Sequence, residues 1–415
     1  MSIRKRTWKT ATGEAKSAWV VDYVDQNRKR HLRTFNKKKQ ADAFAPTASV
    51  EVREGTHVSD NESVTVVEAG RQWIKTAVKN GLERTTVDQY RQHLDIHIAP
   101  YLGGVKLSRL TKSMVREFEN KLRDGTPAPG QSKAEPRTPA LTKKILSSLG
   151  SILADAGEDD KVARNVVRDL RSRRHRGKAR RAERRQKGKL QVGLDIPTTG
   201  EIKAMVAHLP DRWRPLLLTA IFSGLRASEI RGLRWHDVDL SKAELHVRQR
   251  ADRYNVIGKP KSESGERTVP LPPVVVNALR EWKIACPKGR ADLVFPNGAG
   301  NIESHANIIN RALIPVQMAA GVCSVVRDKD RKVVCDKDGE PVRIAKYTGL
   351  HALRHFYASW CINRTVDGGL GLPLKVVQER LGHSSIMMTS DVYGHLFPRG
   401  DDGSELAEAE RKLLG

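Results

Sequence analysis

The sequence predicts a mainly α fold with small β-sheets, an α+β chain divided into several domains. Apolar residues recur with helical spacing over residues 63–160 and again from residue 195 onward. Alternation typical of strands is confined to short stretches near the N-terminus and around residues 240–271. The chain has 415 residues, more than one hydrophobic core usually organises, so a single small module is excluded.

The chain is strongly basic. It carries 74 Lys and Arg against 48 Asp and Glu, a net charge of +26. One charged run alone would indicate a solvated surface, but an excess spread over the whole length favours a nucleic-acid partner. No stretch approaches the roughly 18 apolar residues of a membrane span. The first residues, MSIRKRTWKT, lack the apolar core of a secretory signal, so we expect a cytoplasmic protein with no membrane partner.

Residues 1–60 predict a small strand-rich domain. Apolar and polar residues alternate over residues 18–24, as in a strand. After a turn, residues 28–35 form a second strand-like stretch, and residues 37–45 have helical composition. One interpretation is a solvated hairpin without a partner. The density of Lys and Arg on so slender a sheet favours a strand face that enters a DNA groove.

Residues 61–160 predict a helical domain. Ser63 is a plausible N-cap for the first helix, and a second helix should run from about Thr85 until Pro100 and the following glycines stop it. A third helix follows Thr111. Four prolines make residues 124–139 a loop, after which helical spacing resumes over residues 141–153.

Residues 161–194 predict a basic linker. Fourteen Lys and Arg and two acids give residues 161–189 a net charge of +12, a density that should prevent the run from folding on itself. It is either a solvated tether or a segment that grips DNA phosphates, and both can hold at once.

Residues 195–415 predict a larger, mostly helical domain that ends in a C-terminal tail helix. Charged, hairpin-like residues 321–346 form an insertion between two helices. Helices are expected from Thr198 or Thr199 to Met205, over 213–222, 274–284, 305–318, 350–363 and 374–381, and over 405–414, with strands over 240–250 and 267–271.

The segment SGLRASE places Arg226 after a glycine and at the start of a helix. Glycine lets the backbone approach a ligand closely, and a guanidinium there can offer two donors to two phosphate oxygens. Alternatively, Arg226 pairs with Glu229, three residues further on.

Further reactive residues follow in the same domain. In HALRH, His351 and Arg354 lie three residues apart and so share one helical face. His383 follows the helix-ending Leu381-Gly382, and Tyr393 lies in an exposed-looking polar stretch. A tyrosine is a poor nucleophile unless a base or a cationic field helps to remove its proton.

In order and spacing, these motifs resemble the catalytic signature of the tyrosine recombinases, or phage-type integrases. The signature is GLRxSE, then HxLRH, then LGHSS followed by a tyrosine. KPKSESGERTVPLP and LVFPN are similar to further elements of the family. The resemblance is strong over residues 195–398. It implies an N-terminal three-stranded arm-binding domain, a helical core-binding domain over 63–160 and a mixed α/β-hairpin catalytic domain.

The resemblance also implies a set of chemical roles. Tyr393 would attack the phosphorus, leaving a 3′-phosphotyrosine and a free 5′-hydroxyl. Arg226 and Arg354 would hold the non-bridging oxygens, where negative charge builds. Lys261 would protonate the departing 5′-oxygen, with Lys259 as the competing choice.

The histidines complete the implied site. His351 would be the acid or base partner of Tyr393, and His383 would donate a hydrogen bond to the phosphate. His355 and His395 are expected to pack in the core. No cofactor and no metal is implied.

The function implied is site-specific recombination that integrates or excises a mobile element. The implied partners are double-stranded DNA with attachment sites, three further copies of the chain in a tetramer, DNA-bending accessory proteins and an excisionase. Two alternatives stay open: a catalytically inactive DNA-binding regulator of the same fold, and a type IB topoisomerase-like enzyme.

Overall fold

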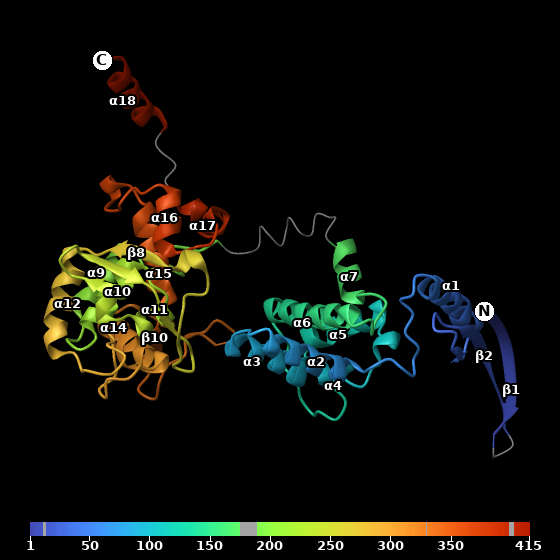
Figure 1. Cartoon of the computed structure of the whole chain (residues 1–415). Coiled ribbons are helices and arrows are strands. Elements are labelled where there is room, and N and C mark those ends of the chain that lie inside the picture. Colours follow the sequence, from blue (N-terminus) through green and yellow to red (C-terminus); the bar gives the residue numbers. More distant parts are fainter. Residues whose placement is uncertain (11–13, 175–188, 329, 398–401) are drawn as a thin grey trace. The chain divides into compact units, whose positions relative to one another are not determined.

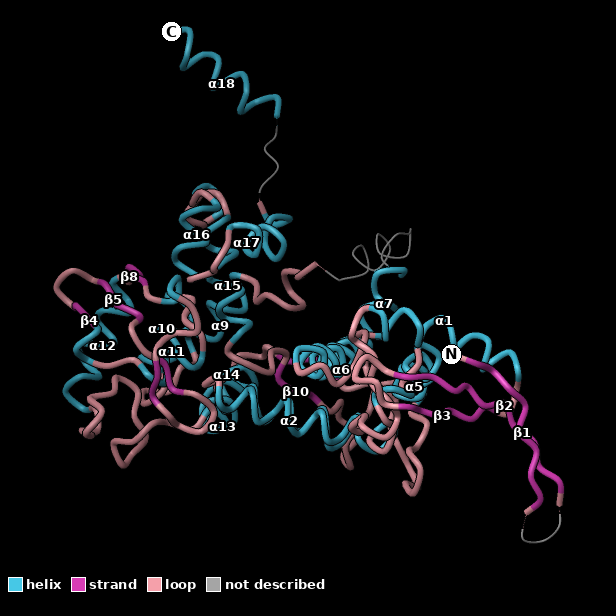
Figure 2. Tube along the Cα trace, turned by 45° about the vertical axis from the view of Figure 1, so that its right-hand side comes forward, coloured by secondary structure: helices cyan, strands magenta, loops and turns pink. Residues whose placement is uncertain are grey.

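The computed structural model describes residues 1–10, 14–174, 189–328, 330–397 and 402–415. The chain divides into two compact units, Met1–Gln186 and Lys187–Gly415. Figure 2 shows strands in an N-terminal sheet and in short pairs of the second unit, with helices and loops elsewhere. Among the residues described, no helix combines the length and the apolar character needed to cross a bilayer.

The first unit begins with an antiparallel sheet in the order β1-β2-β3, with helix α1 packed on one face (Figure 1). The elements are β1 (Ser2–Lys9), β2 (Ala15–Val24), β3 (Arg30–Phe35) and α1 (Lys38–Arg53). Tyr23 lies opposite His31 in the register, and Trp19 lies opposite Phe35. Val21, Tyr23 and α1 form a small core, so the hairpin does have a partner.

The helices that follow form the core of the same unit, with α6 spanning it beside α2 and α5 (Figure 1). Ser63 is not the cap of the first helix, as the sequence suggested. Thr65 caps it instead, because Thr65 and Glu68 form a reciprocal capping box. The elements are α2 (Val66–Lys79), α3 (Arg84–Gln92), a π-helical segment (His93–Ile98), α4 (Ala99–Leu102), α5 (Lys112–Asp124) and α6 (Pro139–Glu158).

The second expected helix ends at the predicted glycines, but Pro100 does not stop it. Pro100 lies at the start of α4, directly after the π-helical segment His93–Ile98, and the chain stays helical until Leu102. Gly103 and Gly104 then end it.

Part of the basic run folds, which corrects the expectation that it cannot. Residues Val166–Arg174 form α7, and Val166 and Val167 are buried in the core of the helical bundle. Two adjacent valines thus pack this helix against the bundle, which the net charge of the segment did not indicate. The remainder of the run, residues 175–188, lies outside the described residues.

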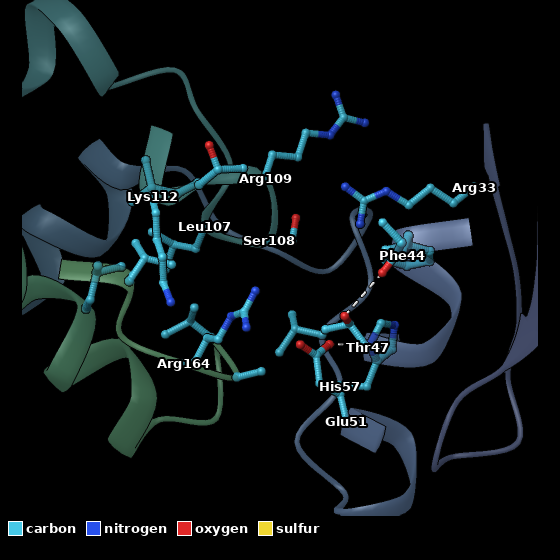
Figure 3. A pocket seen from close by; sticks show the side chains of 18 of the residues that line it. Arg33, Phe44, Thr47, Glu51, His57, Leu107, Ser108, Arg109, Lys112 and Arg164 are labelled. Carbon is cyan, nitrogen blue, oxygen red and sulfur yellow. Dashed lines mark hydrogen bonds and ion pairs between the residues drawn. The ribbon is translucent and has the colours of Figure 1, made fainter. Parts of the chain in front are cut away.

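A pocket of about 680 Å³ lies in the first unit, between α1, the start of α5 and the chain before α7 (Figure 3). Asp60 links the elements beside it. Its carboxylate lies 3.5 Å from Arg33 of the sheet and accepts hydrogen bonds from Ser108 at 2.6 Å and Arg109 at 2.9 Å. Burial raises the pKa of Asp60, but these hydrogen bonds and cations outweigh it and hold that pKa below its usual range.

The second unit is mainly helical, around one large apolar core. Its helices are α9 (Thr199–Ala207), α10 (Arg214–Ser223), α11 (Ala227–Gly232), α12 (Pro273–Ala285), α13 (His305–Ile308), α14 (Ile314–Ala319), α15 (His351–Ile362), α16 (Leu374–Leu381), α17 (Ile386–Tyr393) and α18 (Asp402–Leu414). Its strands are β4 (Val238–Asp239), β5 (Glu244–Val247), β6 (Arg250–Ala251), β7 (Ile257–Gly258), β8 (Arg267–Pro270), β9 (Cys323–Val325) and β10 (Arg343–Ala345).

The sheets of this unit are small. Strands β4, β5 and β8 form one antiparallel sheet, in which Leu245 lies opposite Val269. Strands β9 and β10 pair within residues 321–346, which confirms the hairpin character of the insertion. Between them, Val326, Val334 and Val342 each donate a backbone hydrogen bond to another member of the trio.

Candidate active site

The first arginine of the site is fixed by its own helix. Arg226 is the N-cap of α11, as the sequence predicted, and its side chain remains partly exposed. The ion pair with Glu229 also forms, because Nη1 lies 2.7 Å from a carboxylate oxygen of Glu229. A second donor, Nη2, reaches the backbone carbonyl of Gly382 at 3.0 Å. Pairing with Glu229 and binding of a phosphate by Arg226 are therefore compatible, because the ion pair orients a guanidinium that still faces solvent.

The second arginine is one of the most deeply buried side chains of the unit. Arg354, on α15, is 2% exposed. It donates to the carbonyl oxygens of Gly224 and Leu381, at 2.6 Å each. A guanidinium carries five N–H donors, so these two bonds to described residues leave donors for a phosphate. Burial, followed by Arg226, lowers its pKa to about 9.

Glycine is required where Arg354 meets the turn after α10. Gly224 adopts a left-handed φ of +62°, and a Cβ there would lie 2.3 Å from the ring of Tyr357. The tight packing holds the Gly224 carbonyl against the Arg354 guanidinium. The glycine of the GLR motif thus serves the site by its close approach to α15.

Three arginines converge on the C-terminal end of α16. Arg267 donates to the carbonyl of Arg380 at 2.8 Å, Arg354 to that of Leu381, and Arg226 to that of Gly382. The last carbonyls of a helix lack partners within the helix and carry partial negative charge, so cations there are stabilised. The end of α16 therefore holds residues from α11, β8 and α15 in one place.

Arg267 was missed by the sequence analysis. It is 6% exposed at its side chain and bonds both carboxylate oxygens of the buried Glu229, at 2.8 and 3.3 Å. Its Nη1 also donates to the carbonyl of Gly265, in the loop that carries Lys261. Burial raises the pKa of Glu229, but Arg267 and Arg226 outweigh it and hold it below its usual range. Nothing in the local sequence marks Arg267 as buried, because four other charged residues lie in the same motif: Lys259, Lys261, Glu263 and Glu266.

Tyr393 lies at the end of α17 and is 1% exposed. The expectation of an exposed polar stretch is wrong for this side chain, because α17 turns it into the core of the unit. Its ring is nearly parallel to that of His383, with centroids 6.3 Å apart. Burial raises the pKa of Tyr393 to about 12, against the opposing effect of Arg354 and Arg226.

The hydroxyl of Tyr393 bonds to a histidine that the sequence analysis had set aside. Nδ1 of His355 lies 2.7 Å from it. The expectation that His355 only packs in the core is therefore corrected. The spacing in HALRH contained the signal, because His355 lies one turn after His351 and shares its helical face.

The other two predicted histidines are placed differently. His383 is buried, and its Nδ1 lies 2.9 Å from the hydroxyl of Thr389. Burial, followed by Arg354 and Arg226, lowers its pKa to about 4. His351 is exposed at the start of α15, and its ring stands edge-on to that of His355 at 4.5 Å between centroids. Although the residue is exposed, partial desolvation of its ring, followed by Arg354 and Arg226, lowers the pKa of His351.

The lysines of the hairpin lie at the surface. Lys261 and Lys259 are both exposed, in the loop between β7 and β8. The structure thus brings together Arg226, Arg354, His383 and Tyr393, with His351 at their edge. It attaches the Lys261 loop to them through Arg267.

Comparison with family models matches two parts of the chain. Residues 198–399 match the phage integrase family, and residues 65–123 match the N-terminal SAM-like domain of phage integrases. Among curated proteins, a XerC-like tyrosine recombinase of Caldanaerobacter subterraneus is 26% identical over 403 residues, which cover 90% of each chain. A putative prophage phiRv2 integrase of Mycobacterium tuberculosis is 25% identical and aligns over 88% of this chain and 86% of its own.

Solved structures share the fold. The Tn1549 transposon integrase in complex with a circular intermediate DNA gives a TM-score of 0.59 at 18% identity, covering 84% of this chain and 99% of that one. The lambda integrase tetramer bound to a Holliday junction gives 0.51 at 16% identity, covering 91% and 95%. By both family models and by relatives aligned over most of its length, the chain belongs to the phage integrase family of tyrosine recombinases, enzymes that break and rejoin DNA strands.

Proposed function

We propose that this chain is a site-specific recombinase that integrates or excises a mobile element through a 3′-phosphotyrosine intermediate. The observation that carries the proposal is the environment of Tyr393. This side chain is buried, its hydroxyl is bonded to a histidine, and it lies within the electrostatic field of Arg354 and Arg226. A packing tyrosine has no need of two cations and a proton acceptor. The similarity to a prophage integrase supports a mobile element as the substrate.

The proposed chemistry follows from these contacts. Tyr393 attacks the scissile phosphorus, and the bond to the 5′-oxygen breaks. Arg226 and Arg354 offer preorganised donors to the non-bridging oxygens, which costs no reorganisation as charge develops. His383 donates a further hydrogen bond to the phosphate, and His351, exposed at the edge of the site, acts in acid–base exchange.

Lys261 is the proposed proton donor to the departing 5′-oxygen, with Lys259 as the competing lysine. Both lie on an exposed loop that Arg267 ties to Glu229 and hence to Arg226. The bond energy is kept in the phosphotyrosine, so rejoining needs no external energy source.

The rest of the chain would supply the DNA. We assign residues 1–60 to arm-type DNA binding, 61–160 to core-type binding, 161–194 to a phosphate-contacting linker and 195–415 to catalysis and the tail helix. The sheet supports the first assignment, because the face opposite α1 exposes Arg4, Arg6 and Arg30. We expect a tetramer on paired attachment sites, with bending proteins and an excisionase, acting in the cytoplasm.

A suicide DNA substrate tests the proposal. The substrate is a nicked duplex that carries a candidate attachment site, taken from the direct repeats at the chromosomal junctions of the element. We expect a covalent protein–DNA adduct with the natural chain and no adduct with Tyr393→Phe. The control Tyr101→Phe should form as much adduct as the natural chain, because Tyr101 lies in the first unit, where its hydroxyl bonds to Thr126.

Two results would decide for the alternatives. DNA binding without an adduct on any candidate site would indicate an inactive regulator. Adduct formation and plasmid relaxation on DNA of unrelated sequence would indicate a topoisomerase-like enzyme.

A further inference from the structure

The hydroxyl of Tyr393 and the ring of His355 form a direct contact between two helices. His355 projects from α15 and Tyr393 ends α17, and the 2.7 Å separation is that of a well-formed hydrogen bond. The rings meet at 62°, with centroids 5.7 Å apart. His355 is half-buried and Tyr393 is buried, so water competes weakly for the hydroxyl.

The surroundings keep His355 in the form that accepts a proton. Burial, followed by His351 and Arg354, lowers the pKa of His355 to about 4, while Asp195 acts in the opposite direction. The imidazole is therefore neutral near pH 7. A neutral imidazole with its proton on Nε2 presents a lone pair at Nδ1, which is the atom that faces the tyrosine.

His351 stands one turn earlier and does not take this place. Among the hydrogen bonds of the described residues, the Tyr393 hydroxyl is bonded to His355. His351 is exposed and contacts His355 edge to face. It is positioned to influence His355 or to meet substrate, whereas His355 touches the reacting atom.

We propose that His355 is a catalytic residue that accepts the hydroxyl proton of Tyr393 at Nδ1 during strand cleavage. This rests on the proposed function. As the O–H bond breaks and the N–H bond forms, the tyrosine oxygen bonds to phosphorus. The bond from phosphorus to the 5′-oxygen breaks, and that oxygen takes a proton from Lys261. On rejoining, the 5′-hydroxyl attacks the phosphorus and returns its proton to Lys261, while the phosphotyrosine bond breaks and the imidazolium returns its proton to Tyr393.

The negative phosphate explains why a weakly basic histidine can serve. In the free protein, a proton on His355 would be repelled by Arg354 and disfavoured by burial. A bound phosphate, whose charge grows in the transition state, offsets both effects at the moment of transfer. The imidazole of His355 is thus neutral in the free protein and becomes basic enough to accept the proton when the DNA phosphate is bound.

The test measures the rate of adduct formation by the full-length chain on the suicide duplex described above. In His355→Asn, the amide oxygen can still accept a hydrogen bond but takes up no proton. We expect this variant to form adduct about 10²-fold or more slowly at pH 7, with unchanged DNA affinity, and to recover as the pH rises and hydroxide removes the tyrosine proton. His208→Asn is the control, because His208 follows the end of α9 and bonds the backbone oxygen of Ala204 through Nδ1.

A second variant separates proton transfer from packing. Added imidazole should restore adduct formation by His355→Ala several-fold, and should not do so for Arg354→Ala. Equal or faster cleavage by His355→Asn would overturn the inference and mark the contact as one that restrains Tyr393 in the free protein. Absence of adduct from the natural chain would instead count against the proposed function, so the two failures are distinguishable.

Discussion

Arg267 grips Glu229 with two donors, Nη2 at 2.8 Å and Nη1 at 3.3 Å, and both side chains are almost fully buried. Glu229 in turn holds the Arg226 side chain and its backbone N–H. A charged pair in the interior is not a strong source of stability in itself. Its effect here is positional: it sets the direction of Arg226 and ties the loop of Lys261 to the end of α16.

Removing Arg267 should therefore loosen the site and destabilise the unit. Loss of one partner of a buried ion pair costs up to about 3–5 kcal/mol, and Glu229 would keep only Arg226 as its cation. We expect Arg267→Met to increase hydrogen exchange in α11 and α16 together, as measured by mass spectrometry. Arg267→Lys should recover only part of the protection, because an ammonium cannot form the two-pronged bond.

The control and the contrary result follow from a surface pair. Arg364→Met, which breaks a 2.9 Å contact with Asp367 between side chains that are 40% and 50% exposed, should leave exchange in α11 unchanged. If Arg267→Met left exchange in both helices as in the natural chain, the positional role of Arg267 would be wrong.

Gly224→Ala should damage the site from its other side. The left-handed φ of +62° costs a residue with a Cβ about 1–2 kcal/mol, and the overlap with Tyr357 costs a further ~1–3 kcal/mol. The carbonyl that Arg354 bonds would be displaced, so we expect lower thermal stability of the second unit and slower adduct formation.

Gly321→Ala isolates the backbone contribution. Gly321 has a similar φ of +69°, but nothing lies within 4 Å of its Cβ position. We therefore expect Gly321→Ala to lose only the backbone contribution to thermal stability, about 1–2 kcal/mol. Equal losses in the two variants would mean that crowding against Tyr357 contributes nothing.

Local spacing was enough to predict many of the elements. The helical period located α5, α6, α10 and α12, and Thr111 was correctly identified as a helix start. Of the two predicted candidates, Thr198 and Thr199, Thr198 caps α9. Each of these depends on residues within one or two turns. Buried valines in a basic run were harder to recognise, because the charge density of the segment that includes α7 outweighs two apolar residues in any local count.

The contacts of the site could not be predicted in the same way. Arg354 bonds Gly224 across 130 positions, and Arg226 bonds Gly382 across 156. Spacing shows which face of a helix a residue occupies but not which distant carbonyl it meets. Arg267 was missed for this reason, since its partners come from other elements. Spacing did place His355 on the face of His351, but it did not show that Tyr393 of α17 would meet His355.

Acid should weaken the link that Asp60 makes in the first unit. The pKa of this carboxyl is held below the ordinary aspartate value near 3.8, so its contribution to stability is present above that value and is lost as the pH falls through the lower folded-state pKa. We expect Asp60→Asn to increase hydrogen exchange around Ser108 and Arg109 at pH 7, and to differ little from the natural chain once Asp60 is protonated.

An exposed pair provides the comparison. Glu117→Gln breaks an ion pair with Lys121 whose carboxylate side chain is 65% exposed, and it should change exchange in the same region little at either pH. A difference between Asp60→Asn and the natural chain that persisted undiminished in acid would contradict the charge-based account.

The effect of replacing Arg354 should depend on the negative charge of the scissile phosphate. If its guanidinium compensates the negative charge on a non-bridging oxygen, Arg354→Ala should slow adduct formation about 10²–10³-fold on an ordinary phosphodiester. Replacing that oxygen by a methyl group removes the charge, so the defect should shrink markedly on a methylphosphonate at the scissile position. The partly exposed Arg234, which pairs with Asp237 at 2.7 Å, is the control: Arg234→Ala should cleave both substrates as the natural chain does. An equal defect of Arg354→Ala on the two substrates would assign Arg354 to holding Gly224 and Leu381 in place rather than to the phosphate.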